Sequence, residues 1–241
     1  MITPTLSSRS EFLAVVGDHP FAALYTSERL SAYQRGNAWV WVSEGPWGAL
    51  TAGLGDGTAA LELLAELQAA GLAKGGRLHA PRVPREAVLG LFSAHHFGEW
   101  DQLWSTTPPP AARGEELVEL LPAEATPDID QLLDEALPDS SVRPGKGGVR
   151  DWYGIREDGR LVAVAADRSA NGVGLLAGIA VAPDQQGRGL GAAVTVAATR
   201  RLFTRYATVS LAVMSDNERA IKLYERLGYT SGVARTSFDL S

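Results

Sequence analysis

The sequence predicts a mixed α/β protein in which helices flank a mixed central sheet and a second, smaller α/β domain precedes the main one. Three observations support this fold class. Strand-like and helix-like segments alternate along the 241 residues. The prolines at 108–110 divide these segments into two groups, because they cannot continue a helix or a central strand. The composition, with 45% hydrophobic and 21% charged residues, is typical of a globular protein.

The prolines also predict the domain boundaries. We expect a first domain over 1–107, a proline-rich linker over 108–115 and a second domain over 116–241. A long loop within one domain is the alternative interpretation of the proline segment.

Composition excludes several classes of protein. The absence of cysteine excludes disulfides, thiolate metal sites and cysteine nucleophiles. The net charge of −6 argues against a general nucleic-acid-binding protein. No apolar run of signal-peptide length opens the sequence, and none reaches the ~18 residues of a membrane helix. We therefore expect a cytoplasmic monomer or homodimer without nucleic-acid or membrane partners.

The segments before the prolines follow the order strand, helix, strand, helix, strand. Trp39 and Trp41 alternate within a run of strand formers, and we interpret both as packing residues. Apolar residues recur near the helical period after Thr58, which can cap the helix, and stop at Gly71. The expected strands are 38–45, 77–81 and 97–105, and the expected helices are 58–71 and 84–96.

The segments after the prolines begin with an alternating strand at 116–123 and a helix at 126–138. Pro127 at the first helical position favours that helix. Asp158-Gly159 predicts the turn of a hairpin over 151–169. The pattern continues with a strand over 172–183, a helix to about 206, a strand over 208–216, a helix over 217–228 and a final strand or bent hairpin over 229–240.

Glycines alternate with other residues where the helix after strand 172–183 must begin: Gly187, Gly189 and Gly191. The first N–H groups of a helix have no intrahelical partner, and the helix dipole adds positive potential there. Glycines leave these donors unshielded. The turn therefore suits a phosphate or pyrophosphate.

Three other interpretations of this turn carry less weight. A Walker loop requires Gly-Lys-Ser/Thr, whereas alanines follow Gly191. A dinucleotide fingerprint fits through Gly187, Gly189 and Ala192, with Asp216 ending the next strand, but too few strand–helix units follow for a doubly wound sheet. A structural turn with coincidental glycines is the simplest alternative.

Two motifs resemble the GNAT superfamily of N-acetyltransferases. The stretch Gln186-Gly187-Arg188-Gly189-Leu190-Gly191 matches its Q/R-x-x-G-x-G/A signature, and the preceding GIAVAPDQ is similar to its central strand. The later SDNERAIKLYERLGY resembles its second motif, with Leu223-Tyr224 two turns into a helix. The resemblance covers about 116–241 and implies the GNAT fold there.

The resemblance implies that acyl-coenzyme A lies in a splay between two central strands. Main-chain groups of Ile179, Ala180 and Val181 would pair with the pantetheine arm. Arg188 is a candidate phosphate contact, with a solvated loop charge as the alternative. The residues whose amides would hold the pyrophosphate are Gln186, Gly187, Arg188, Gly189, Leu190, Gly191 and Ala192.

Tyr224 matches the general acid proposed for this family. A phenol with a pKa of about 10 is protonated at neutral pH and can protonate the departing thiolate. Asn217 lies about two helical turns before Tyr224, on the same helix face, and is a candidate ligand of the pantetheine side. The alternatives are a core aromatic for Tyr224 and an N-cap for Asn217.

The general base is left open by the sequence, because strand 172–183 has no ionisable side chain where many relatives carry a glutamate. The alternatives are a water held by main-chain carbonyls, Asp151 at the hairpin edge, or an amine that arrives neutral. A solvated strand-end charge is the simpler interpretation of Asp151. The Val181 amide is the expected donor to the oxyanion.

Two features before the prolines have weaker functional signals. His95 and His96 lack metal-ligand spacing and an evident acidic partner, so we predict no metal site. The glycine loop at 53–57 contains Asp56, which would repel a phosphate. The layout resembles glycine N-acyltransferase-type proteins, which pair a degenerate GNAT-like first half with an active second half.

The resemblance therefore implies an enzyme that transfers an acetyl or short acyl group from coenzyme A to an amine in a ternary complex. The expected acceptor is an amine of a small molecule or of a protein or peptide. The alternative is a non-catalytic acyl-CoA sensor or interaction module, which would bind coenzyme A without releasing free thiol.

Overall fold

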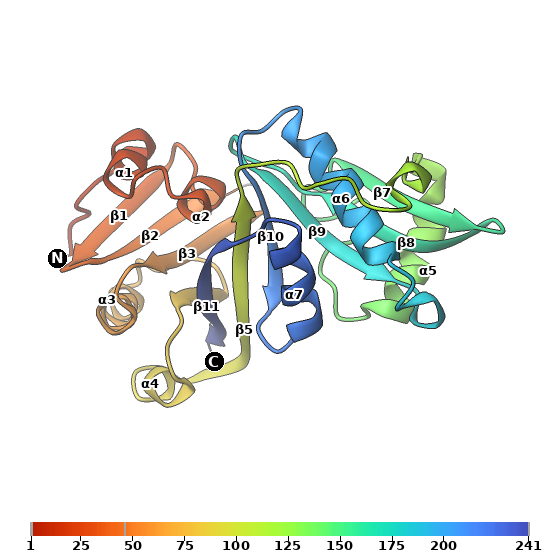
Figure 1. The fold of residues 1–241 in the computed structure, drawn as a ribbon. Helices are drawn as coiled ribbons and strands as arrows, with labels where there is room; N and C mark the ends of the chain where they lie inside the picture. The colour runs from red at the N-terminus through yellow and green to blue at the C-terminus, as the bar shows by residue number, and fades with distance from the viewer. Residues whose placement is uncertain (1, 46, 241) are drawn as a thin grey trace. The chain divides into compact units, whose positions relative to one another are not determined.

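The computed structural model describes residues 2–45 and 47–240 (Figure 1). The chain forms two compact units. The first contains residues up to 102, 213–218 and those from 232 onwards, and the second contains residues 103–212 and 219–231. Each unit is an α/β structure with its own buried core.

The sheet of the first unit combines antiparallel and parallel pairs. β1 (Leu30–Arg35), β2 (Ala38–Gly45) and β3 (Gly48–Leu54) form an antiparallel meander. β4 (Arg77–Pro81) pairs parallel with β3 and antiparallel with β11 (Ser231–Leu240). β5 (Ala94–Ser105) follows β11 in the strand order.

Helices cover both faces of the first sheet, because side chains of successive strand residues point to opposite faces. Trp39 and Trp41 pack with α1 (Arg9–Val15) and α2 (Pro20–Leu24). Val40 and Val42 pack on the other face with α3 (Gly57–Ala69), and Val88 of α4 (Arg85–Leu89) joins that core. Both tryptophans are buried, which agrees with their interpretation as packing residues.

The sheet of the second unit is mostly antiparallel, with a parallel pair. Next to β10 (Val209–Met214) the order is β9 (Gly174–Val181), β8 (Arg160–Asp167), β7 (Asp151–Glu157) and β6 (Glu119–Leu120). β9 is parallel to β10 and antiparallel to β8. The predicted hairpin is confirmed, with its start at Asp151 and its turn at Asp158 and Gly159, but β8 ends at Asp167, two residues before the expected end.

Two helices cover opposite faces of this second sheet (Figure 1). α5 (Thr126–Ala136) packs through Ile129, Leu132 and Leu133 against residues of β7, β8 and β9. α6 (Leu190–Phe203) lies along the other face, where its apolar residues are buried. α7 (Glu218–Arg226) follows β10, and the short 3-10 helices are η1 (Glu115–Leu117), η2 (Ala123–Ala125) and η3 (Pro183–Gln185).

The predicted fold class is confirmed, but several predicted elements are wrong in length. The helix expected over 84–96 ends at Leu89, and residues 94–96 already belong to β5. The strand expected over 116–123 is reduced to β6, because η1 occupies 115–117. Asp56 rather than Thr58 caps α3, since its Oδ1 accepts the Ala59 N–H at 2.8 Å.

The compact units do not follow the predicted division into 1–107, 108–115 and 116–241. The final strand belongs to the first unit because Arg235–Asp239 pairs with Arg77–Pro81, which places Phe238 in the first core. The proline segment lies inside the second unit, where the Pro109 carbonyl accepts a hydrogen bond from Arg200 of α6 at 3.1 Å.

Candidate functional site

The two central strands of the second unit pair only where they begin. Val209, Ser210 and Leu211 of β10 lie opposite Gly174, Leu175 and Leu176 of β9. From Ala177 to Val181, β9 continues beside β8, and the described chain shows no ladder pair on its other edge. The second half of β9 is therefore an open strand edge.

A bulge marks the point where this edge opens. Ala166 pairs with Ala177 and Val164 pairs with Ala180, so β9 has an extra residue between the two pairs. Gly178 lies there with φ of +56°, a conformation that favours glycine. A Cβ at this position would lie 3.2–3.3 Å from Val142 and Trp152, so glycine also provides the close packing. An isolated glycine in an apolar strand is a sequence signal for such a bulge.

Strand alternation decides which main-chain groups face the open edge. The Ala182 N–H donates to the Val162 carbonyl of β8 at 2.9 Å, and Ala180 pairs with Val164. Because hydrogen-bonding groups alternate along a strand, Ile179 and Val181 turn theirs to the open edge. The Gln186 side chain lies near this edge and donates to the Val181 carbonyl at 3.5 Å.

The glycine turn follows β9 directly and opens α6. Gly187 and Gly189 both have φ of +86°, so the left-handed backbone explains two of the three glycines. Gly189 is the N-cap of α6 and no side chain caps the helix. Ala193 is the first residue that bonds back, to the Gly189 carbonyl at 3.0 Å. The N–H groups of residues 190–192 consequently have no intrahelical acceptor.

Ion pairs with the β7–β8 hairpin flank the turn on both sides. Asp184 in η3 accepts a hydrogen bond from Arg160 at 2.8 Å, and that pair lowers the pKa of the Asp184 carboxyl. Arg188 pairs with Glu157 at 2.5 Å and also contacts the Gln185 side chain. The Arg188 guanidinium is thus held by Glu157, rather than being a fully solvated loop charge.

Tyr224 lies in the last turns of α7 and is buried, with 7% of its surface exposed. Burial raises the pKa of its hydroxyl to about 12. The structure gives this hydroxyl no hydrogen-bond partner among the described residues, in contrast to Tyr229, whose hydroxyl lies 2.7 Å from the Thr199 hydroxyl. The two rings are 6.2 Å apart. Tyr224 thus has a protonated, uncommitted hydroxyl.

The other two sequence candidates have defined surroundings. Asn217 directly precedes α7, and its N–H donates to the Met214 carbonyl at 3.0 Å. Asp151 lies 3.9 Å from the guanidinium of Arg205, which also holds the fully buried Asp167 at 2.7 Å. This ion pair favours the structural interpretation of Asp151.

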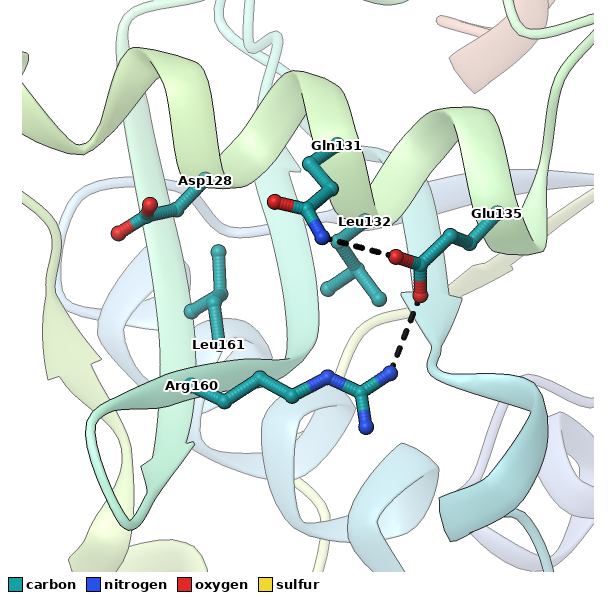
Figure 2. A pocket seen from close by; sticks show the side chains of 6 residues that line it. All are labelled: Asp128, Gln131, Leu132, Glu135, Arg160 and Leu161. Atoms are coloured by element: carbon teal, nitrogen blue, oxygen red, sulfur yellow. Dashed lines mark hydrogen bonds and ion pairs between the residues drawn. The ribbon is translucent and has the colours of Figure 1, made fainter.

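A small pocket lies between α5 and β8 in the second unit (Figure 2). Its polar lining is largely satisfied within the chain, because Glu135 accepts hydrogen bonds from Arg160 at 3.1 Å and Gln131 at 3.0 Å. Asp128 is likewise bound by Arg156 at 2.7 Å. The residues that line the pocket therefore belong to the ion-pair network next to the glycine turn, which Arg160 joins through Asp184.

The histidine pair of the first unit has a nearby acid that the sequence did not reveal. His95, His96 and Asp239 offer ligand atoms within 4.8 Å of one another. Asp239 is already bound by Arg77 at 2.9 Å, and a cation there would face this guanidinium.

No helix in the described part of the chain has the length and hydropathy needed to cross a bilayer.

Comparison with known proteins shows a similar family over part of the chain and a similar fold over nearly all of it. Residues 152–237 match the FR47-like protein family. The GCN5-related N-acetyltransferase from Kribbella flavida superposes with a TM-score of 0.55 at 18% identity over 95% of each chain. An acetyltransferase of the GNAT family from Colwellia psychrerythraea gives 0.57 at 12% identity over 100% of both chains. Residues 152–237 thus resemble the FR47-like family, and the two solved structures show that the chain has a GNAT-type fold.

Two curated relatives match part of the chain. A mycothiol acetyltransferase from Acidimicrobium ferrooxidans is 40% identical over 79 residues, which are 30% of this chain and 26% of the relative. Another from Nocardiopsis dassonvillei is 37% identical over 100 residues, or 34% and 30% of the two proteins. The matches therefore span less than a third of the relatives' length.

Proposed function

We propose that the second unit binds an acyl-coenzyme A and transfers its acetyl or short acyl group to an amine. The observation that carries the proposal is the open edge of β9 leading directly into the glycine turn. An extended amide chain can pair with Ile179 and Val181 as an added strand does. A pyrophosphate at the end of that chain reaches the unpaired N–H groups at the start of α6.

Acyl transfer needs groups that stabilise the negative charge as it forms on the carbonyl oxygen and on the departing sulfur. The amine attacks the thioester carbonyl, the carbonyl oxygen becomes an oxyanion, and the carbon–sulfur bond then breaks. The Val181 N–H is the proposed oxyanion donor, because a fixed main-chain dipole needs no reorganisation. Tyr224 is the proposed general acid, which gives its hydroxyl proton to the departing thiolate. Asn217 is the proposed ligand of the pantetheine side.

The attacking amine must lose a proton, and β9 offers no ionisable side chain for this step. We propose that a water held by main-chain carbonyls accepts the proton, or that the amine binds in its neutral form. Both routes use the open edge of β9 and need no further acidic residue.

The names of the two curated relatives support a low-molecular-weight acceptor. We propose a small-molecule amine as the first acceptor class to test and a peptide N-terminus as the second.

The test combines binding with turnover. Calorimetry of the full chain with acetyl-coenzyme A should give saturable heat, and thiol release should depend on an added amine from a panel of small amines and peptides. Absence of binding in a folded sample would overturn the proposal.

A second candidate function is a non-catalytic acyl-CoA sensor, and the lack of an ionisable side chain on β9 favours it. The sensor predicts heat of binding with no thiol released under any acceptor. Thiol release with any amine of the panel excludes it.

A further inference from the structure

Arg235 is a fully buried arginine on β11 in the first unit, with 0% of its surface exposed. One hydrogen bond joins its Nη2 to the His79 carbonyl at 2.9 Å. Its guanidinium carbon lies 4.1 Å from the centre of the Phe21 ring. Nε and Nη1 have no hydrogen-bond partner in the described chain. Since Nε carries one hydrogen and Nη1 two, at least three of the five guanidinium hydrogens lack an acceptor.

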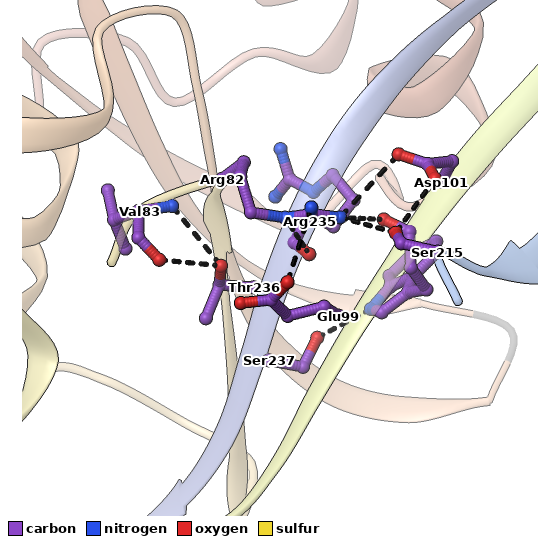
Figure 3. A network of polar contacts seen from close by, with 9 residues as sticks. Arg82, Val83, Glu99, Asp101, Ser215, Arg235, Thr236 and Ser237 are labelled. Atoms are coloured by element: carbon purple, nitrogen blue, oxygen red, sulfur yellow. Dashed lines mark hydrogen bonds and ion pairs between the residues drawn. The ribbon is translucent and has the colours of Figure 1, made fainter. Parts of the chain in front are cut away.

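No ion pair joins Arg235 to a carboxylate within the residues that the structure describes. The acids of the neighbouring network belong to Arg82, which lies 3.4 Å from Glu99 and 3.6 Å from Asp101 (Figure 3). Arg82 also donates to the Ser215 hydroxyl at 2.5 Å and to the Arg235 main-chain carbonyl at 3.1 Å. These acids are thus committed to another guanidinium.

The histidines near Arg235 are neutral bases. Burial and the charge of Arg235 together lower the pKa of His19 and of His79, so neither is protonated at neutral pH. Burial also lowers the pKa of Arg235 itself to about 9, against the opposing effect of Tyr25, and leaves the guanidinium charged at neutral pH. This charge has no carboxylate partner among the described residues.

The visible partners of Arg235 leave most of its donors unsatisfied. Burial of an unpaired charge is costly, and the contact with Phe21 and the single hydrogen bond each offset part of that cost. Water at Nε and Nη1 would supply acceptors alone, whereas an anion would supply acceptors and the opposite charge.

We propose that Arg235 is the centre of an anion-binding site in the first unit, which takes a carboxylate or an inorganic oxyanion of similar size. The unpaired Nε and Nη1 are its donors. An anion can reach these atoms only if α2 shifts, because both atoms are buried and Phe21 of this five-residue helix lies over the guanidinium. His19 and Tyr25, which flank this helix, are only partly buried. The site is independent of the acyl-transfer chemistry proposed for the second unit.

The test measures thermal unfolding against anion concentration. Sodium formate and inorganic phosphate are titrated in parallel at constant ionic strength, with the bulky zwitterionic sulfonate HEPES, as its sodium salt, as the balancing anion. Wild-type protein should show a saturable rise in Tm with at least one of them, because an anion that binds only the folded state stabilises it. The formate and phosphate arms distinguish a carboxylate from a phosphate ligand.

Arg235→Met should abolish the saturable rise. Arg85→Met is the matched control, because Arg85 also lies over an aromatic ring, Phe97 at 4.5 Å, within the same unit. The control should keep the rise. A wild type without saturable stabilisation, or an Arg235→Met variant that retains it, overturns the proposal.

A direct measurement keeps the proposal testable if Arg235→Met does not fold. Wild-type crystals soaked in sodium bromide should show an anomalous peak within ~3.5 Å of Nε or Nη1 of Arg235. Water alone at that position, with bromide bound only at the surface, contradicts the proposal.

Discussion

Tyr224 and Tyr229 show how two buried phenols in one region take different roles. Burial raises the pKa of both hydroxyls, but only Tyr229 has a partner, the Thr199 hydroxyl. The sequence offered both tyrosines within the second motif. The resemblance selected Tyr224, and the structure adds that its hydroxyl is uncommitted.

Tyr224→Phe should lower kcat by ~10²-fold, because general acid catalysis typically contributes that much or more. The KM for acetyl-coenzyme A should change little, since the proton moves only in the reaction. Steady-state kinetics with an active amine acceptor measures both parameters.

The matched control is Tyr229→Phe, which removes a buried hydroxyl of the same kind. It should cost about 1 kcal/mol of folding free energy through the lost hydrogen bond and leave kcat nearly unchanged. Equal kcat values for wild type and Tyr224→Phe would exclude the acid role.

The glycine turn and the open edge of β9 are the features that matter at the scale of elements. Gly187 and Gly189 fix a left-handed backbone, and the turn is anchored through Asp184 and Arg188 to the β7–β8 hairpin. A Cβ at residue 189 would meet nothing within 4 Å. The turn therefore faces open space, which is where a phosphate group would lie.

Gly189→Ala should destabilise the fold by about 1–2 kcal/mol, because φ of +86° is strained for alanine. It should also weaken binding of coenzyme A by at least ~10-fold, since the methyl group and the relaxing backbone disturb the N–H groups of residues 190–192. Calorimetry and chemical denaturation measure the two effects.

Gly172→Ala separates strain from binding. Gly172 has φ of +82° and equally open surroundings, but lies in the loop before β9. We expect the same loss of stability with unchanged affinity for coenzyme A. If both variants bind coenzyme A as wild type does, the turn is not the pyrophosphate site.

At the scale of the whole molecule, the last strand decides the composition of the first unit. β11 pairs with β4 and brings Arg235, Ser237 and Phe238 into contact with residues more than 150 positions earlier in the chain, such as His79. His79 is enclosed by this pairing: its Nδ1 lies 2.7 Å from the Ser237 hydroxyl, and burial together with Arg235 lowers its pKa to about 3. The stability of the first unit is therefore linked to pH.

We expect stability to fall as pH drops from 6.5 towards 3. His79 is neutral in the folded state over this range and protonated in the unfolded state, so its contribution is complete above 6.5 and is lost progressively below it. The expected slope is about 1.4 kcal/mol per pH unit. Urea unfolding of wild type and of His79→Gln between pH 7 and pH 5 measures it, and an unchanged slope in the variant would contradict this origin.

The elements that the sequence alone determined are those set by local chemistry. Glycines at 187 and 189 need no distant partner to favour a left-handed turn, and the hairpin turn at Asp158-Gly159 and the helix opening at Pro127 are equally local. The motifs in the second unit predicted the fold class correctly because they too depend on residues close together in the sequence. Helix 84–96 was mispredicted because the competing strand β5 depends on partners elsewhere in the chain.

Only the tertiary structure decided how distant segments combine. The open edge of β9 depends on where β10 stops pairing, the site of Arg188 depends on Glu157 of another strand, and the burial of Arg235 depends on β4 and α2. None of these follows from local propensity, because strand partners and buried charges are chosen by contacts between residues far apart in the sequence. The sequence thus determined the left-handed glycine turn, and the fold determined what lies beside it.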